Sequence, residues 1–253
     1  MTKWLRSLRL SVCISAGVLV LVSFKISQLS LDQAWLCAVT VMAIACATMV
    51  HNDWRDRRQD AKRGKRLAHD HPGMFFIFLL YLWKTAVGLS VWMTIENNSM
   101  GLLAWLMIIS GLIYSEIRKI PMMPILFVCV TGASAALFPV FAGHNLPQIW
   151  MLFLLVFIAI FVREISTDLR DISTDVGYKW TLPQKLGIQR TEIIIGISVF
   201  WGLLVAMIIS PKTLISLPFV AIATFHILKR KDHKTFKIFL DMGIAATIFA
   251  LLV

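Results

Sequence analysis

The sequence predicts an all-α integral membrane protein with about nine transmembrane helices in a single bundle. Its 253 residues are 58% hydrophobic and only 15% charged, and the mean hydropathy is +0.77. Soluble domains are about 45–50% apolar and about 25% charged, so a soluble core could not hide this apolar surplus. Two further observations support this fold class, namely the apolar runs along the chain and the sorting of its cations.

Apolar runs long enough to cross or nearly cross a bilayer, which takes about 20 helical residues, recur from end to end. We expect helices at 8–28, 32–51, 74–94, 99–116, 121–142, 147–165, 191–210, 213–229 and 236–253. The first run follows a basic cluster, as in a signal peptide, but no small-x-small cleavage site comes after it, so we interpret it as a retained helix. No linker or low-complexity stretch separates the runs, which predicts one domain over residues 1–253.

The cations are sorted between alternate connecting segments. With nine helices, the N-terminus and the segments after the second, fourth, sixth and eighth helices share one side of the membrane. These segments hold 22 of the 25 Lys and Arg residues, and the exceptions are Lys25, Lys84 and Lys212. The positive-inside rule makes this side cytoplasmic. Topology therefore accounts for the net charge of +11, and we expect no nucleic-acid partner.

Two polar segments on this cytoplasmic side, about 51–73 and 163–190, carry the same acidic pattern. The spacing D-x2-D-x3-D is shared by two triplets, which are Asp53, Asp56 and Asp60, and Asp168, Asp171 and Asp175. Each triplet follows an even-numbered helix, and four helices separate the two. This predicts a parallel internal repeat of helices 1–4 and 5–8 with a ninth helix added.

The spacing of the triplets suits metal chemistry. On a helix, residues i, i+3 and i+7 lie on one face, where three carboxylates repel one another unless a cation lies between them. Mg²⁺ prefers oxygen ligands and is commonly held by one or two carboxylates together with substrate phosphates. Acidic residues interleaved with Arg at a membrane surface can also be solvated ion pairs of little energetic worth. Because the same spacing occurs twice, at equivalent helix ends, we favour two clusters that hold Mg²⁺ around a diphosphate.

With these motifs the chain resembles the UbiA superfamily of intramembrane prenyltransferases. The family's first motif, N-D-x-x-D-x-x-x-D, is matched by Asn52 and the first triplet. The second triplet is followed by family features, which are Gly177, Thr181, Leu182, Pro183 and Gly187. Other likenesses are Arg163 and Glu164 before that triplet, and Tyr114 followed by Arg118 and Lys119. The segment 65–73 departs from the Arg-Pro-x-x-S-G stretch of many members.

The resemblance implies a mechanism and a set of site residues. An isoprenyl diphosphate would lie with its tail among the helices, and a small acceptor would be alkylated through an allylic cation. Asp53, Asp56, Asp171 and Asp175 would bind Mg²⁺, with Asp60 and Asp168 as further metal ligands. The substrate-binding residues would be Asn52, Tyr114, Arg118, Lys119, Lys65 and Arg66. Lipid surrounds such an enzyme, and a bacterial or archaeal plasma membrane is the expected location.

Other functions remain open on the sequence alone. A terpene cyclase or a diphosphate-cleaving enzyme with the same fold would need the same aspartates and no acceptor. A membrane transporter also combines repeats with acidic residues, although its sites usually lie near the bilayer midplane. The acceptor of a transferase is open as well, between an aromatic compound and a prenylated glyceryl phosphate. A soluble prenyl-diphosphate synthase is excluded by the apolar runs.

Overall fold

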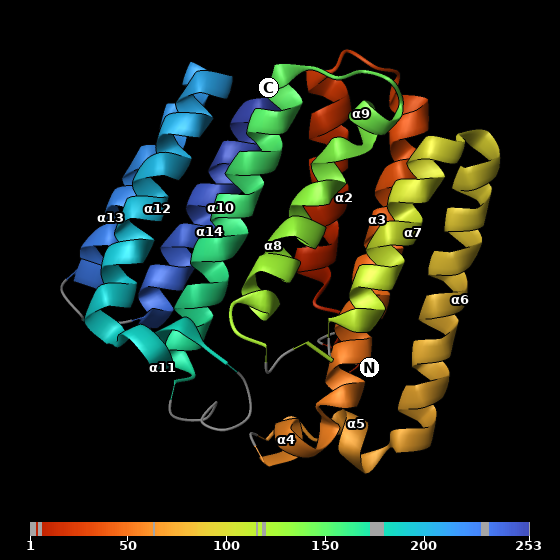
Figure 1. The fold of residues 1–253 in the computed structure, drawn as a ribbon, viewed down its shortest axis with the longest axis horizontal. Coiled ribbons are helices and arrows are strands. Elements are labelled where there is room, and N and C mark those ends of the chain that lie inside the picture. Colours follow the sequence, from red (N-terminus) through yellow and green to blue (C-terminus); the bar gives the residue numbers. More distant parts are fainter. Residues whose placement is uncertain are drawn as a thin grey trace. The chain divides into compact units, whose positions relative to one another are not determined.

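The computed structural model describes residues 4, 7–62, 64–114, 116–117, 120–172, 180–228 and 233–252, and all regular secondary structure in them is helical. Each of the nine apolar runs contains helix (Figure 1). The long or apolar helices are α2 (Leu10–Ile26), α3 (Leu31–Arg55), α6 (Pro72–Glu96), α7 (Asn98–Ile113), α8 (Met123–Ser134), α10 (Pro147–Arg170), α12 (Ile188–Ile209), α13 (Leu217–Leu228) and α14 (His233–Leu252). The short elements are α4 (Arg57–Lys62), α5 (Leu67–Asp70), η1 (Ala135–Leu137), α9 (Phe138–Phe141), α11 (Leu182–Leu186) and η2 (Pro211–Ser216).

Five helical stretches are long and apolar enough to cross a membrane within the described residues. They are Asp32–Arg55, Pro72–Glu96, Met123–Phe141, Pro147–Arg170 and Ile188–Ile209. Three further apolar helices are shorter than this, at Leu10–Ile26, Asn98–Ile113 and Ile238–Leu251. The all-helical membrane fold is therefore confirmed at the level of several spanning helices, and the count of nine spans stays a prediction.

Two of the expected helices are interrupted, and a proline explains each interruption. The run 121–142 changes from α8 to the 3₁₀ turn η1 and then to α9, whose second residue is Pro139. The run 213–229 begins as the 3₁₀ helix η2 before α13, whose second residue is Pro218. Proline has no N–H to donate and its ring collides with the carbonyl four residues earlier, so a regular α-helix cannot pass through it.

The chain forms two compact units, and the first of them carries the first acidic motif. It comprises Met1–Ser115 and Ser134–Asn145. Helix α3 packs against α2, α6 and α7 in this unit. The packing is close where residues are small: a Cβ added at Gly17 would lie 2.7 Å from the side chain of Met42, and one at Gly111 would collide with Thr48. Small residues allow membrane helices to approach in this way, since lipid supplies no hydrophobic force between them.

An aromatic cluster fixes the end of α3 where the first motif begins. Phe75, at the start of α6, is 1% exposed. Its ring stacks on Trp54 of α3 at 6.4 Å and on Trp4 at 5.8 Å between ring centroids. Each buried aromatic pair adds about 0.5–1.5 kcal/mol beyond its area. The backbone that carries the motif is therefore held by α6 and by the N-terminal segment.

The second unit, Glu116–Ala133 and Leu146–Val253, carries the second acidic motif. Helix α10 packs against α12 and α14, and its buried residues Val162, Ile165 and Leu169 belong to the core of the unit. An ion pair joins α10 to α14, with Arg163 Nε 3.5 Å from Asp241 Oδ1. The last turns of α10 are thus anchored directly before the motif.

Candidate functional site

The first motif spans the end of α3 and the short helix that follows it. Asp53 lies in the last turn of α3, Asp56 is the residue that ends the helix, and Asp60 lies in α4. The amide of Asp56 donates to Asn52 O at 2.9 Å, and the amide of Asp60 donates to Asp56 O at 2.8 Å. Because these bonds continue the helical direction across the break, the three aspartates stay on consecutive turns. Asn52, the other motif residue, is half-buried beside them.

The electrostatics of this helix end are unfavourable for carboxylates. The last carbonyl groups of a helix give its C-terminus a partial negative charge, which favours cations and disfavours anions. Asp53 and Asp56 lie at that end of α3, and Asp60 follows within one turn. The carboxyl groups of Asp53 and Asp60 are only 15% and 10% exposed. Ionised groups are seldom buried so deeply without cations near them.

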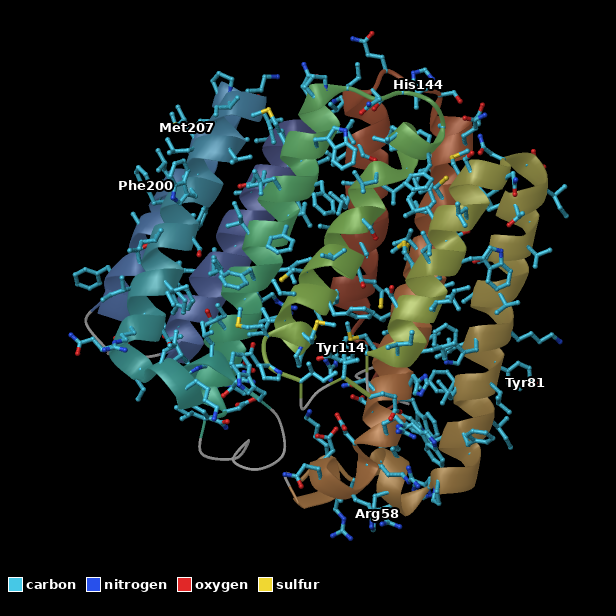
Figure 2. The ribbon with its side chains drawn as sticks, viewed as in Figure 1. Arg58, Tyr81, Tyr114, His144, Phe200 and Met207 are labelled. Atoms are coloured by element: carbon cyan, nitrogen blue, oxygen red, sulfur yellow. The ribbon has the colours of Figure 1, made fainter. Side chains whose placement is uncertain are left out.

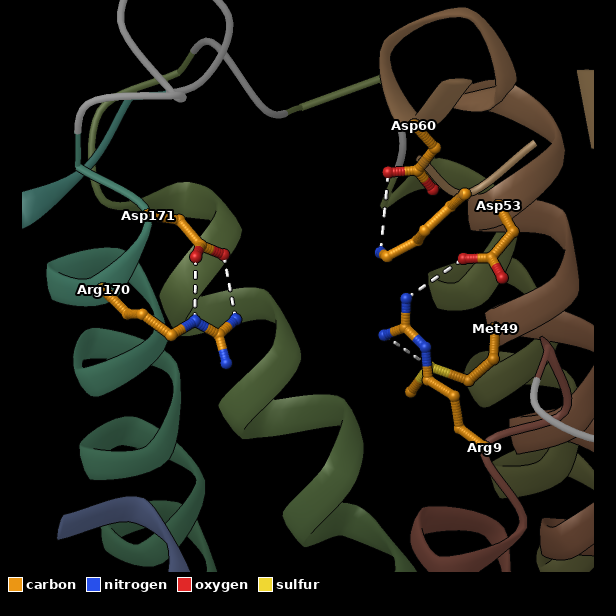
Figure 3. A network of polar contacts seen from close by, with 7 residues as sticks. Arg9, Met49, Asp53, Asp60, Arg170 and Asp171 are labelled. Carbon is orange, nitrogen blue, oxygen red and sulfur yellow. Dashed lines mark hydrogen bonds and ion pairs between the residues drawn. The ribbon is translucent and has the colours of Figure 1, made fainter. Parts of the chain in front are cut away.

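Two cationic side chains of the same unit form ion pairs with these carboxylates (Figure 3). Arg9 Nη2 lies 3.0 Å from Asp53 Oδ1, and Lys65 Nζ lies 3.6 Å from Asp60 Oδ1. Lys65 reaches back because Gly64 has a φ of 82°, in the left-handed region that glycine tolerates. The turn is closed by the amide of Lys65, which donates to Asp60 O at 2.9 Å.

The second motif repeats the local geometry of the first in its own unit. Asp168 lies in the last turn of α10 and Asp171 is the residue that ends the helix, just as Asp53 and Asp56 do on α3. The amide of Asp171 donates to Thr167 O at 3.0 Å. Asp168 is 1% exposed. Asp175 lies outside the described residues.

Arg170 holds both carboxylate oxygens of Asp171. Its Nε lies 2.8 Å from Oδ1 and its Nη2 lies 3.0 Å from Oδ2. The Arg170 side chain is 46% exposed. Each of the two motifs therefore has an arginine on a carboxylate at the negative end of a helix.

The other predicted substrate-binding residues divide into three groups. Lys65 lies at the first motif, as described above, whereas Arg66 pairs with Asp70, with Nε 3.4 Å from Oδ1. A hydrogen bond from His69 is the main cause that holds the pKa of Asp70 below its usual range, and Arg66 lowers that pKa further. Tyr114 is half-buried at the end of α7, in the unit of the first motif (Figure 2). Arg118 and Lys119 lie outside the described residues.

One residue at the first motif, Arg9, was not predicted from the sequence. It precedes α2 and counts in the sequence only as one of the cytoplasmic cations. Its contact with Asp53 joins positions 44 residues apart. No spacing rule connects such distant residues, and the packing of α2 on α3 is what brings them together.

The described residues fit an Mg²⁺ ion that is bound partly by the protein and partly by water and substrate, rather than one enclosed by protein groups alone. Among them, no group of three or more His, Cys, Asp or Glu residues could hold a metal ion by itself. Mg²⁺ is usually bound by one or two carboxylates, with water and substrate phosphates completing an octahedral shell. Asp53 and Asp60 are partly buried carboxylates that each meet a cation with Oδ1 alone, and such oxygens are the ligands this ion prefers.

Comparison with family models identifies one match that covers nearly the whole chain. The model is described as the UbiA prenyltransferase family and matches residues 10–244. A comparison with individually curated proteins gave no match.

Solved structures of similar fold extend over the same length. A UbiA homologue from Aeropyrum pernix K1 is 16% identical, with a TM-score of 0.75 and coverage of 96% of each chain. A UbiA homologue from Archaeoglobus fulgidus, bound to GPP and Mg²⁺, is 19% identical, with a TM-score of 0.68 over 99% of this chain and all of the other. A digeranylgeranylglyceryl phosphate synthase is 19% identical, with a TM-score of 0.68 over 99% of this chain and 96% of the other. At these identities the likeness establishes the fold.

Proposed function

This chain belongs to the UbiA prenyltransferase family, and we propose that it transfers an isoprenyl group from an isoprenyl diphosphate to a small acceptor inside the membrane. It is an integral membrane protein and an enzyme of that family. The proposal extends to the donor, the acceptor class and the site residues.

The observation that carries the proposal is the repeated placement of the two acidic motifs. In both, the middle aspartate ends a long apolar helix and another aspartate lies one turn before it. Carboxylates at this helix end cost free energy unless cations are bound. Both motifs place aspartates at the same positions of a helix C-terminus, where carboxylates are unfavourable. Repeated departures of this kind from local stability are expected of functional residues.

The aspartates and the nearby cations have complementary roles in the proposed reaction. Asp53, Asp56, Asp171 and Asp175 bind the metal, with Asp60 and Asp168 as further ligands. Bound Mg²⁺ supplies charge neutralisation for the departing diphosphate. Lys65, Arg66, Arg118 and Lys119 bind the phosphate oxygens, because cationic donors make short, strong hydrogen bonds to them. Asn52 and Tyr114 contact the substrate, and the apolar helices keep water from the allylic cation.

The same proposal includes a topology. We infer nine membrane helices in a single bundle, built from a parallel repeat of helices 1–4 and 5–8. Its N-terminus and both motif segments face the cytoplasm of a bacterial or archaeal cell, since 22 of 25 cations fall on that side.

Thiol labelling checks this topology. The exposed residues Arg58 and Lys185 stand for the two motif segments, and exposed Lys212 stands for the opposite side. In inverted vesicles, Arg58→Cys and Lys185→Cys should react with an impermeant maleimide, whereas Lys212→Cys should not. Three native cysteines, Cys13, Cys37 and Cys129, are buried, and Cys46, partly exposed on α3, is replaced by alanine in the parent protein to remove its background. Labelling of Arg58→Cys and Lys185→Cys from opposite sides would contradict the inferred topology.

The reaction itself is tested with purified protein and labelled geranyl, farnesyl and geranylgeranyl diphosphates. Each donor is incubated with Mg²⁺ or with a chelator, with and without pooled aromatic and glyceryl phosphate acceptors, and all products are identified by mass spectrometry. We expect Mg²⁺-dependent consumption of donor only when an acceptor is present, and the alkylated product then names the acceptor class.

Other outcomes of this assay point to other functions. A cyclic hydrocarbon or a prenyl alcohol formed without acceptor would show a cyclase or a diphosphate-cleaving enzyme of the same fold. A separate measurement in vesicles that showed substrate flux independent of Mg²⁺ would favour a transporter. Either result would replace prenyl transfer as the function.

A further inference from the structure

Arg9 is held between two side chains on one face of α3. Its Nη2 donates to Asp53 Oδ1 at 3.0 Å, and its Nη1 lies 3.6 Å from Met49 Sδ (Figure 3). Met49 and Asp53 are four residues apart, so they are neighbours on the helix surface. These two contacts orient the guanidinium of Arg9, whose side chain is 40% exposed, against the carboxylate.

The Arg9 backbone is in a strained conformation at this position. Its φ of 47° and ψ of 50° are left-handed, a conformation that costs a residue other than glycine about 1–2 kcal/mol. Such outliers persist when the surrounding contacts outweigh them, and they concentrate at functional sites.

The contact with Asp53 uses one carboxylate oxygen and leaves the second available. Arg9 meets Oδ1, and within the described residues Oδ2 takes part in no ion pair or hydrogen bond. This differs from Asp171, both of whose oxygens are held by Arg170. Carboxylates that bind metals are themselves hydrogen-bonded by neighbouring groups that fix their orientation, and loss of such a group costs about 10–100-fold in metal affinity.

We propose that Arg9 is a positioning residue of the first acidic motif, which holds Oδ1 of Asp53 so that Oδ2 is presented to a divalent cation. This rests on the proposed function, because it takes Asp53 as a metal ligand. Arg9 itself touches neither metal nor substrate in this role. The guanidinium also compensates the charge of a carboxylate that is only 15% exposed.

The test measures metal binding in the absence of donor and acceptor. The full chain in detergent is titrated with Mn²⁺, with and without inorganic pyrophosphate, and free Mn²⁺ is followed by electron paramagnetic resonance. Arg9→Gln should weaken Mn²⁺ binding about 10–100-fold. Arg9→Lys should weaken it less, because lysine keeps the positive charge but lacks the forked N–H donors of the guanidinium.

A matched control separates orientation from charge. Arg58 is exposed, belongs to the same motif segment and points away from the helices (Figure 2). Arg58→Gln removes the same charge from the same neighbourhood and should leave Mn²⁺ affinity within about twofold, since exposed charges interact weakly. An equal effect of Arg9→Gln and Arg58→Gln, or no effect of Arg9→Gln, overturns the proposal. Tighter binding by Arg9→Gln also overturns it, because Arg9 would then compete with the metal.

Two further variants keep the result interpretable. Arg9→Gly accepts the left-handed backbone without strain, so it should keep the melting temperature and still lose Mn²⁺ affinity. A variant that lost stability without losing affinity would assign Arg9 a structural role instead. Asp53→Asn serves as the reference for the site: if it binds Mn²⁺ normally, the metal assignment of the proposed function fails. If Asp53→Asn loses binding and neither Arg9→Gln nor Arg9→Gly does, the role of Arg9 alone fails.

Discussion

Replacing Asp56 by asparagine is expected to abolish prenyl transfer without destabilising the fold. Asp56 ends α3, where its charge faces the negative end of the helix. Removing that charge should raise the free energy of unfolding by about 0.3–1 kcal/mol. A metal ligand contributes several kcal/mol to the transition state, so turnover at saturating Mg²⁺ should fall at least about a hundredfold. Turnover and melting temperature are measured on the same preparation.

The matched control is at the opposite end of the same helix. Asp32 is exposed in the first turn of α3, where a negative charge is favourable. Asp32→Asn should therefore lose about 0.3–1 kcal/mol of stability and keep its turnover. Near-normal turnover in Asp56→Asn would rule out the two-motif metal site, and a large loss of melting temperature would mean that Asp56 is structural.

The sequence predicted the long helices because their signal is local. An apolar run of sufficient length has to form helix in a membrane, since its backbone polar groups find no water there. The placement of α3, α6 and α10 follows from this rule alone. The short helices α4, α5 and α11 were not expected, because they lie in polar segments where apolar length gives no information. Pro139 and Pro218 are local signals for a helix break, but the long apolar runs around them favoured the prediction of uninterrupted helices.

The candidate site also has features that local sequence patterns predict and contacts that only the packing of distant segments creates. The spacing of the aspartates revealed both motifs, and their equivalent positions at the ends of α3 and α10 follow from it. The spacing contained no information on which cation meets which carboxylate. Arg9 reaches Asp53 through packing between two helices, and Lys65 reaches Asp60 through a left-handed glycine. Arg66 pairs with Asp70 four residues later, and its expected contact with the substrate stays a prediction.

At the second motif, Asp171→Asn and Arg170→Gln should have different consequences, although each removes one partner of the same ion pair. Asp171→Asn is expected to lower turnover about as much as Asp56→Asn, at least about a hundredfold, because it removes a metal ligand. Arg170→Gln should keep turnover and lower the Mg²⁺ concentration needed for half-maximal activity, since Arg170 no longer competes for Oδ1 and Oδ2.

The size of the Arg170 effect follows from its exposure. With the Arg170 side chain 46% exposed, the pair is worth about 0.2–1 kcal/mol, so the Mg²⁺ requirement should fall by up to about fivefold. If the aspartates were only solvated ion pairs at a membrane surface, both substitutions would have the same small effect on stability and none on Mg²⁺ dependence. Activity measured against Mg²⁺ concentration in the two variants therefore decides between a surface ion pair and a metal site whose aspartate is held by arginine until the ion binds.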